Sequence, residues 1–248
     1  MKPWLATGML LLSAGCAHVQ EKPTHWTYEG AEGPEHWGEL ADSYRMCTVG
    51  KNQSPINLDS QHEIEAQLSP LALAYKAGGK EVLNNGHTVQ VSYEPGNTLT
   101  LDGYSYELKQ FHFHAPSENE IDSKQYPMEA HLVHADKDGN LAVLALMFTE
   151  SATDNPGLNQ FWSQIPAKAE EKVALTTKVD ASKLLPAKHD YYRFNGSLTT
   201  PPCTEGVVWL VMKQPVSASK AQIEKFSQIM GHPNNRPVQP VNARTVLK

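Results

Sequence analysis

Two short histidine-bearing segments constrain the fold of this chain more than any other feature of its sequence. Segments 110–114 (QFHFH) and 129–134 (EAHLVH) both alternate apolar with polar residues, which is the pattern of a half-buried β-strand. Residues i and i+2 of a strand point to the same face of its sheet, so His112 and His114 share one face. If the second segment forms the neighbouring strand, His131 joins them there. Three histidines with one open position form the arrangement of a catalytic zinc site.

The histidine pair taken alone permits other interpretations. Histidines at i and i+2 also occur as ordinary strand residues, and His134 lies on the opposite face of its strand, where we interpret it as structural. The spacing from His112 to Glu118 also fits part of the metal motif of cupins, which are jelly rolls. The complete cupin motif requires glycines where this chain has Tyr106 and Gln125, and no second glycine-rich block with His and Asn follows. A cupin is therefore disfavoured.

The chain as a whole predicts one sheet-dominated α+β domain. Its 248 residues are 40% hydrophobic and 19% charged, an ordinary globular composition. The net charge is −6 and no Lys/Arg cluster occurs, which argues against a nucleic-acid partner and favours a small molecule. Helical spacing is confined to 156–165 and 219–230, the latter ended by Gly231. Strand-like runs are frequent and occur at 71–76, 87–93, 98–102, 105–115, 129–135, 141–149, 191–194 and 207–212.

The N-terminal segment predicts export from the cytoplasm. A positive start precedes an apolar run at 4–12 that is too short to span a bilayer, and small residues follow. Residues 1–16 therefore resemble a secretory signal. The small residues before Cys16 resemble a bacterial lipoprotein cleavage site, with Ser13 where leucine is usual. The alternative is cleavage nearby without a lipid, and membrane contact is expected only through such an anchor. We expect a flexible lead-in at 17–24 and a folded domain at 25–248.

The cysteine count agrees with export. If Cys16 is lipidated or removed, Cys47 and Cys203 remain as an even pair. An oxidising compartment permits a disulfide between them, and the alternative is two unrelated buried thiols.

Four further segments point to a family. They are 30–38 (GAEGPEHWG), 52–56 (NQSPI), 84–91 (NNGHTVQV) and 196–207 (GSLTTPPCTEGV). Together with the two histidine segments, and in this order, they resemble the α-class carbonic anhydrases, in particular exported bacterial members, from about His25 to Arg244. The resemblance implies a central, twisted, mostly antiparallel sheet with zinc at the base of a conical cleft. It also implies an enzyme that reversibly hydrates carbon dioxide to bicarbonate and a proton, through attack by zinc-bound hydroxide.

The resemblance assigns roles to the residues around the metal. It places His112, His114 and His131 on the zinc ligands, and Gln110 and Glu129 on the partners that hold the outer ring nitrogens. Because Glu129 is only two residues from His131, we expect it to orient a histidine of the neighbouring strand. Its apolar sequence context predicts burial.

Thr199 and Glu118 match the family's gatekeeper hydroxyl and its buried carboxylate partner. Glu118 would accept the Thr199 proton, so that Thr199 accepts from the hydroxide and turns a hydroxide lone pair toward the substrate. Taken alone, Thr199 reads as an ordinary turn residue before two prolines. Thr200 matches a position that holds bicarbonate or water.

His87 matches the proton shuttle of the family. Such a histidine stands at the cleft rim with a pKa near the ordinary value of about 6.5. Tyr28 and Asn85 match residues that order the water chain leading to it. Taken alone, His87 reads as a solvated turn histidine. The resemblance also assigns a wall that receives carbon dioxide, whose members alone would read as simple core: Val133, Val143, Leu198, Val207 and Trp209.

The remaining implications concern the frame of the site and its ligands. The resemblance implies a disulfide between Cys47 and Cys203 and cis peptides before Pro55 and Pro202. The short connection from 134 to 141 predicts a wider cleft entrance than in the animal enzymes, and Phe194 stands where a tyrosine is common. We expect sulfonamide and anion inhibitors to bind, and a monomer or a homodimer.

A rival hypothesis belongs to another functional class. It is a non-catalytic zinc-binding or adhesive envelope protein built on the same fold. Glu118, Thr199 and His87 discriminate between the two, because a protein that only binds needs none of them.

Overall fold

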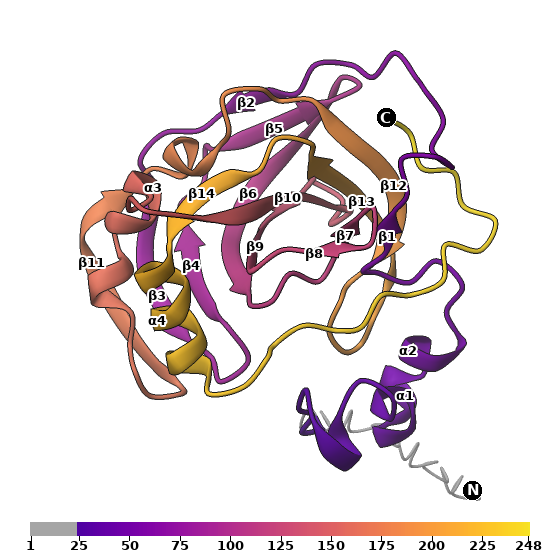
Figure 1. Cartoon of the computed structure of the whole chain (residues 1–248), viewed down its shortest axis with the longest axis horizontal. Helices are drawn as coiled ribbons and strands as arrows, with labels where there is room; N and C mark the ends of the chain where they lie inside the picture. The colour runs from indigo at the N-terminus through magenta and orange to yellow at the C-terminus, as the bar shows by residue number, and fades with distance from the viewer. Residues whose placement is uncertain (1–23) are drawn as a thin grey trace, which may run out of the picture.

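An 11-stranded β-sheet carries the fold, in a computed structural model that describes residues 24–248. The sheet curls strongly, as Figure 1 shows. Its main path runs in the order β11 (Glu171–Val179), β3 (Gly79–Asn84), β4 (Val89–Tyr93), β6 (Tyr104–His114), β9 (Met128–Ala135), β10 (Leu141–Ser151), β13 (Glu205–Met212) and β12 (Tyr191–Ser197). Off this path lie β14 (Val216–Ser219) on β10, β5 (Thr98–Leu101) on β6 and β2 (Ala72–Ala74) on β5.

The pairing in this sheet is mostly antiparallel, as expected. The exceptions within it are β10 with β13 and β10 with β14, which run parallel. A separate three-stranded sheet contains β1 (Asn57–Leu58), β7 (Glu120–Ile121) and β8 (Lys124–Gln125).

The two-residue period of the strands divides the interior into two cores. Phe111 and Phe113 of β6 point into the first core, where they pack against Phe161. Val143 of β10 and Trp209 of β13 point into the second core on the other face of the sheet. The alternation seen in the sequence therefore decides which side chains surround the histidines and which only fill the interior.

Two helical segments cover the first core, and both were predicted. α3 (Pro156–Asn159) continues into the 3-10 turn Trp162–Gln164, and α4 spans Lys220–Met230. In Figure 1, α3 lies beside β14 and α4 lies below β14. The two helices are joined where Gln222 Nε2 of α4 donates to Asn159 Oδ1 of α3 over 2.9 Å. Ser219 and Gln222 form a capping box at the start of α4, and Gly231 ends it with a φ of 75°.

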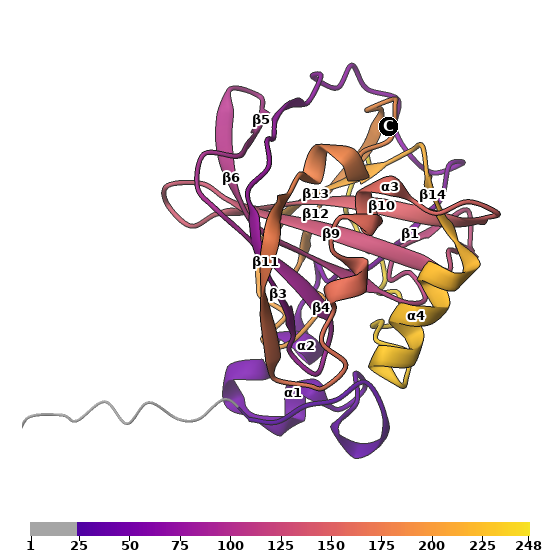
Figure 2. The same ribbon diagram turned by 90° about the vertical axis from the view of Figure 1, so that its left-hand side faces the viewer.

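The remaining helices lie in the N-terminal part of the described chain, and the sequence did not predict them. These are α1 (Trp37–Leu40) and α2 (Met46–Val49), with 3-10 turns at Gly30–Glu32 and Asp42–Tyr44; a further 3-10 turn spans Ala181–Leu184. In both Figure 1 and Figure 2, α1 and α2 lie below the strands of the sheet. Trp37, Tyr44 and Tyr28 form a small third core with the two cysteines.

Covalent and backbone features agree with the expectations for the frame. Cys47 and Cys203 form a disulfide. The peptides Ser54–Pro55 and Pro201–Pro202 are cis, and a third cis peptide that we did not predict precedes Pro116. No helix within residues 24–248 is long and apolar enough to cross a membrane. The predictions for residues 1–16, including lipidation of Cys16, lie outside the described residues.

His134 is a structural residue, as predicted. Its ring is fully buried, the Tyr75 hydroxyl donates to Nε2 over 2.6 Å, and Nδ1 donates to the Ala142 carbonyl over 3.2 Å. Burial lowers the pKa of His134 from 6.5 to about 4, against the opposing effect of the backbone carbonyls.

This buried imidazole predicts a specific loss of stability in acid. Between pH 6.5 and about 4 the unfolded chain binds a proton at His134 that the folded chain does not, so stability falls as the pH falls. The gap corresponds to about 3 kcal/mol. Urea unfolding at pH 7 and pH 4 should show the stability difference between the wild type and His134→Gln shrinking by about that amount. A constant difference at both pH values would contradict the assignment.

Candidate metal centre and active site

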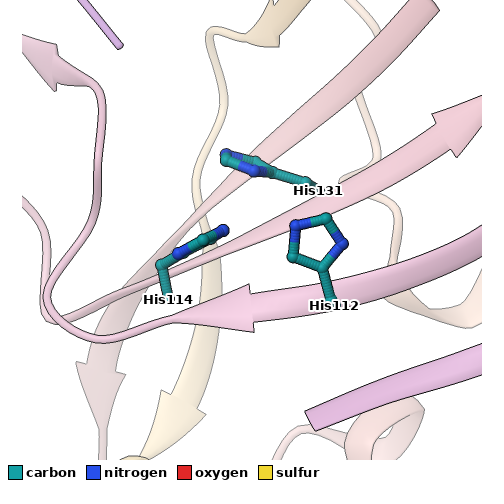
Figure 3. Close-up of side chains that lie close together, drawn as sticks. All are labelled: His112, His114 and His131. Carbon is teal, nitrogen blue, oxygen red and sulfur yellow. The ribbon is translucent and has the colours of Figure 1, made fainter. Parts of the chain in front are cut away.

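The register between β6 and β9 brings three imidazoles together. His112 pairs directly with His131 across the two antiparallel strands, and His114 lies two residues further along β6. Figure 3 shows the three rings converging from these neighbouring strands. Each offers a ligand nitrogen, and these three atoms all lie within 4.8 Å of one another. His114 and His131 are buried, while His112 is half-buried.

Each ring is held through the nitrogen that faces away from the others. His112 Nδ1 donates to Gln110 Oε1 over 2.8 Å, as the sequence predicted. His114 Nδ1 donates to the backbone carbonyl of Asn234 over 2.7 Å, a partner that the sequence did not reveal. His131 Nε2 lies 2.9 Å from Glu129 Oε1, although the two atoms complete no well-aligned hydrogen bond within the described chain. Such outer partners fix the orientation and tautomer of a ligating imidazole.

The prediction that Glu129 orients a histidine of the neighbouring strand was wrong. Glu129 is the cross-strand neighbour of His114, but its carboxylate contacts His131 of its own strand. Residues i and i+2 of a strand point to the same face of the sheet. The Glu129 carboxylate therefore lies next to the His131 ring. Burial of Glu129 was correctly expected, and its oxygens accept from the backbone N–H groups of Glu118 and Asn119 and from the Asn119 side chain.

The three histidines fit a metal ion. With the outer nitrogens directed at Gln110, Asn234 and Glu129, the atoms available to a ligand are His112 Nε2, His114 Nε2 and His131 Nδ1. His114 Nε2 is buried without a hydrogen-bond partner among residues 24–248. Burial lowers the pKa of all three rings, and the positive charge of the neighbouring rings lowers it further for His112 and His131. Neutral imidazoles are the form that binds metal, and three of them with an open position suit Zn²⁺.

Glu118 lies beside the ligand-facing nitrogens of His114 and His131. It is 1% exposed, and Oε1 accepts the backbone N–H of Arg236 over 2.8 Å. Oε2 lies 3.5 Å from His114 Nε2 and 3.8 Å from His131 Nδ1. Burial raises the pKa of Glu118 well above its ordinary value, while the Arg236 N–H and the Thr199 hydroxyl act in the opposite direction. Thr199 is therefore close to Glu118, although Oε2 completes no well-aligned hydrogen bond within the described chain.

A pocket of about 150 Å³ opens beside the histidines. His112, His114 and Thr200 line it, together with Tyr28, Asn85 and His87. None of the residues predicted to form the apolar wall lines this pocket. Val143, Val207 and Trp209 are buried in the second core, and Val133 and Leu198 pack against it. Trp209 meets the His131 ring edge-on, with the ring centroids 4.9 Å apart.

The expected surroundings of His87 need correction. His87 is half-buried and stacks on Trp26 with 3.8 Å between ring centroids, so it is no freely solvated rim residue. Burial lowers its pKa below the ordinary value that we expected, and the nearby charges of His25 and His232 lower it further while Glu170 raises it. Asn85 Oδ1 accepts the backbone N–H groups of His87 and Thr88, so this side chain also builds the turn that carries the histidine.

Comparisons with known proteins agree with this site. A family model described as eukaryotic-type carbonic anhydrase matches residues 32–248. The carbonic anhydrase of Pectobacterium carotovorum is 51% identical over 238 residues, covering 96% of each chain. The α-carbonic anhydrase of Thermovibrio ammonificans, solved with the inhibitor sulfanilamide, superposes with a TM-score of 0.90 at 50% identity, over 92% of this chain and 100% of that one. Dioscorin, solved with ascorbate, gives 0.85 at 33% identity, over 90% and 97%.

The contact between Glu129 and His131 predicts a measurable effect on metal affinity. Glu129→Gln removes the charge that holds the outer nitrogen and should weaken Zn²⁺ binding by about 10- to 100-fold. Competition with a chromophoric chelator measures this, and Glu94→Gln is the control because Glu94 pairs with Lys178 on the surface. Equal affinities for the two variants would show that Glu129 does not support the site.

Proposed function

Because this chain belongs to the α-class carbonic anhydrases, a family of enzymes, we propose that it holds Zn²⁺ on His112, His114 and His131 and reversibly hydrates carbon dioxide to bicarbonate and a proton. One observation carries the proposal: three imidazoles converge, two of them buried, with a partner beside each outer nitrogen, and the Glu118–Thr199 pair stands beside them. Zinc in such a site lowers the pKa of water to about 7, as is known for carbonic anhydrases themselves, and so supplies a nucleophile at neutral pH.

The Thr199 hydroxyl orients the attack in this proposal. Glu118 accepts the Thr199 proton, which leaves the Thr199 oxygen able only to accept from the nucleophile. This directs a lone pair of the nucleophile toward the substrate, and correct orientation is a large part of catalysis. Glu118 suits the role because Arg236 and its burial hold the carboxylate in one place.

Carbon dioxide is uncharged and nonpolar, so an apolar wall suits it. Val143 and Val207 present such a wall at the edge of the second core, and Leu198 packs against it.

Bicarbonate and a proton leave by different routes. Thr200 lines the pocket and offers a hydroxyl to the product, while His87 accepts the proton near the outer end of the pocket, where Tyr28 and Asn85 would order the intervening water.

Because the chain is also similar to dioscorin, the rival hypothesis still has to be weighed. It is a non-catalytic zinc-binding or adhesive protein built on the same fold. The identity of 33% to dioscorin is lower than the 50–51% to the bacterial carbonic anhydrases. Glu118, Thr199 and His87 are all present here, and a protein that only binds a ligand needs none of them. We therefore favour the enzyme.

A stopped-flow assay of carbon dioxide hydration tests the proposal. The protein should accelerate hydration, a zinc chelator should abolish the acceleration, and added Zn²⁺ should restore it. A primary sulfonamide should inhibit, in keeping with the sulfanilamide complex of the Thermovibrio relative. Protein that holds zinc yet leaves hydration at the uncatalysed rate would support the rival.

His87 and Thr199 should affect different kinetic constants. His87→Ala should lower kcat in dilute buffer and leave kcat/KM nearly unchanged, because proton export follows the conversion of carbon dioxide. Added imidazole should restore much of the loss. Thr199→Ala should instead lower kcat/KM, because the nucleophile loses its orientation. An unchanged kcat for His87→Ala in weak buffer would mean that another group carries the proton.

Export remains part of the proposal. We propose a signal at 1–16, a lead-in at 17–24, a carbonic anhydrase domain at 25–248 and an envelope or periplasmic location, with a lipid on Cys16. The disulfide of Cys47 with Cys203 supports an oxidising compartment. Mass spectrometry of the native N-terminus tests the anchor, and an unmodified start beyond residue 16 would indicate secretion without a lipid. Size-exclusion chromatography with light scattering decides between a monomer and a homodimer.

A further inference from the structure

Arg236 is one of the largest fully buried side chains of the described protein. It is 1% exposed and lies in the segment that follows α4. Its Nη1 donates to the Gln53 side-chain oxygen over 2.9 Å and to the Ser54 carbonyl over 2.8 Å, and its Nη2 donates to the Cys47 carbonyl over 3.0 Å. A buried guanidinium normally lies beside a carboxylate, because an isolated buried charge is unfavourable. Here the guanidinium donates only to neutral oxygens, one from a side chain and two from the backbone. The segments that carry these oxygens indicate what the arginine holds in place.

Two of these partners, Gln53 and Ser54, hold the loop 197–203, which contains Thr199, at both of its ends. At the first end, Ser54 N–H donates to Ser197 Oγ over 2.9 Å, and Ser197 N–H donates to Ser54 Oγ over 3.1 Å. At the other end, Gln53 Nε2 donates to the Cys203 carbonyl over 3.0 Å. Cys203 is also joined covalently to Cys47.

The same arginine holds the other member of the pair. Its backbone N–H donates to Glu118 Oε1 over 2.8 Å. Through its side chain Arg236 is therefore one step from both ends of the Thr199 loop, and through its backbone it contacts Glu118 directly. Glu118 and Thr199 come from distant parts of the chain, and Arg236 makes contacts toward both of them.

We propose that Arg236 is a positioning residue that sets the distance between Glu118 and Thr199, with its guanidinium acting as the common anchor of segments 47–54 and 197–203. The proposal rests on the proposed function of the Glu118–Thr199 pair. It assigns no chemical step to Arg236. The backbone N–H would survive any substitution other than proline, so the proposal predicts that the guanidinium, and not the N–H alone, keeps this donor in place.

The shape of the guanidinium explains why arginine occupies this position. Its planar fork presents donors in fixed directions, and here two nitrogens reach three acceptors at the two ends of segment 47–54. Lysine carries the same charge on a single nitrogen and cannot span the acceptors of both Nη1 and Nη2. Arg236→Lys therefore keeps the charge and removes the geometry.

A double-mutant cycle with Thr199→Ala tests the proposal. Arg236→Lys should lower kcat/KM for hydration by about 10- to 100-fold, because small displacements of orienting groups have effects of this size. In the Thr199→Ala background the same substitution should lower kcat/KM by less than about twofold, because the pair it positions is already broken. The kcat in dilute buffer, which reports proton export, should change less than kcat/KM. Zinc content and melting temperature are measured for every variant.

Arg244→Lys is the matched control. Like Arg236, Arg244 donates to three acceptors, here the backbone carbonyls of Val241, Asn195 and Pro240. Within the described chain it forms no hydrogen bond with Glu118 or segment 197–203. It should leave kcat/KM within about twofold of the wild type. Equal losses from Arg236→Lys in both backgrounds, or no loss in the wild-type background, would overturn the proposal.

The test separates this proposal from the proposed function. If the wild-type protein does not hydrate carbon dioxide, the proposed function fails, and a crystal structure of Arg236→Lys then decides the positioning role. A changed Glu118–Thr199 separation, with no such change in Arg244→Lys, would support the role. An unchanged separation would overturn it. Should Arg236→Lys fail to fold, Gln53→Ala removes one acceptor and serves as the second variant, with the same expectations for kcat/KM in the two backgrounds.

Discussion

The antiparallel register of β6 and β9 is the constraint on which the site depends. It sets His112 opposite His131, and the two-residue period then brings His114 and Glu129 to the same face. A slip of one residue would turn every side chain of one strand to the other face and leave at most two imidazoles together. The phenylalanines that alternate with the histidines oppose such a slip, because Phe111 and Phe113 would leave the first core for the face of the metal site. Burial of the two phenylalanines thus fixes the register that brings the histidines together.

Assembling the site buries polar groups that must be paired, and the partners come from remote segments. Asn234 supplies a carbonyl to His114, and Arg236 supplies an N–H to Glu118, so the segment after α4 completes the site from the C-terminal side. In Figure 1 this segment, in yellow, leaves α4 and runs toward β1 and β12. The disulfide fixes the N-terminal side, where Cys47 meets Cys203. Among the described residues, several buried polar atoms near the histidines have no hydrogen-bond partner: His114 Nε2, His131 Nε2 and Glu118 Oε2. Such a group of unsatisfied atoms is what a site for an ion leaves when the ion is not counted.

The sequence predicted what depends on periodicity and on side-chain identity. All eight predicted strands exist, and the metal-facing histidines and Gln110 lie as expected. Six strands of the described chain were not predicted: β1, β3, β7, β8, β11 and β14. The long strand β11 was missed because most of its residues are exposed and its threonines and lysines show no alternating burial. The Asn234 contact could not be predicted either, because any residue type offers a backbone carbonyl. The partner of Glu129 was misassigned for a different reason: i and i+2 side chains were treated as too close to interact, although a long carboxylate reaches a flanking ring.

One face of the sheet packs against the first core, and the other face packs the second core and supports the site. This limits which residues of the site can be changed without loss of stability. On β10, Leu144 and Leu146 point into the first core, while Val143 and Ala145 between them point into the second. The second core ends at the wall proposed to receive carbon dioxide, and Trp209 joins it to the His131 ring. Side chains of this wall are therefore core residues as well. Enlarging the wall at Val143 or Val207 would overpack a buried cluster, and shrinking it would leave a cavity, so either change alters stability together with substrate access. Thr200 and His87 line the pocket with partial exposure and belong to neither of these two cores, although His87 stacks on Trp26. Variation that changes the handling of product or proton with a smaller loss of stability is accordingly expected at these positions and not on the wall.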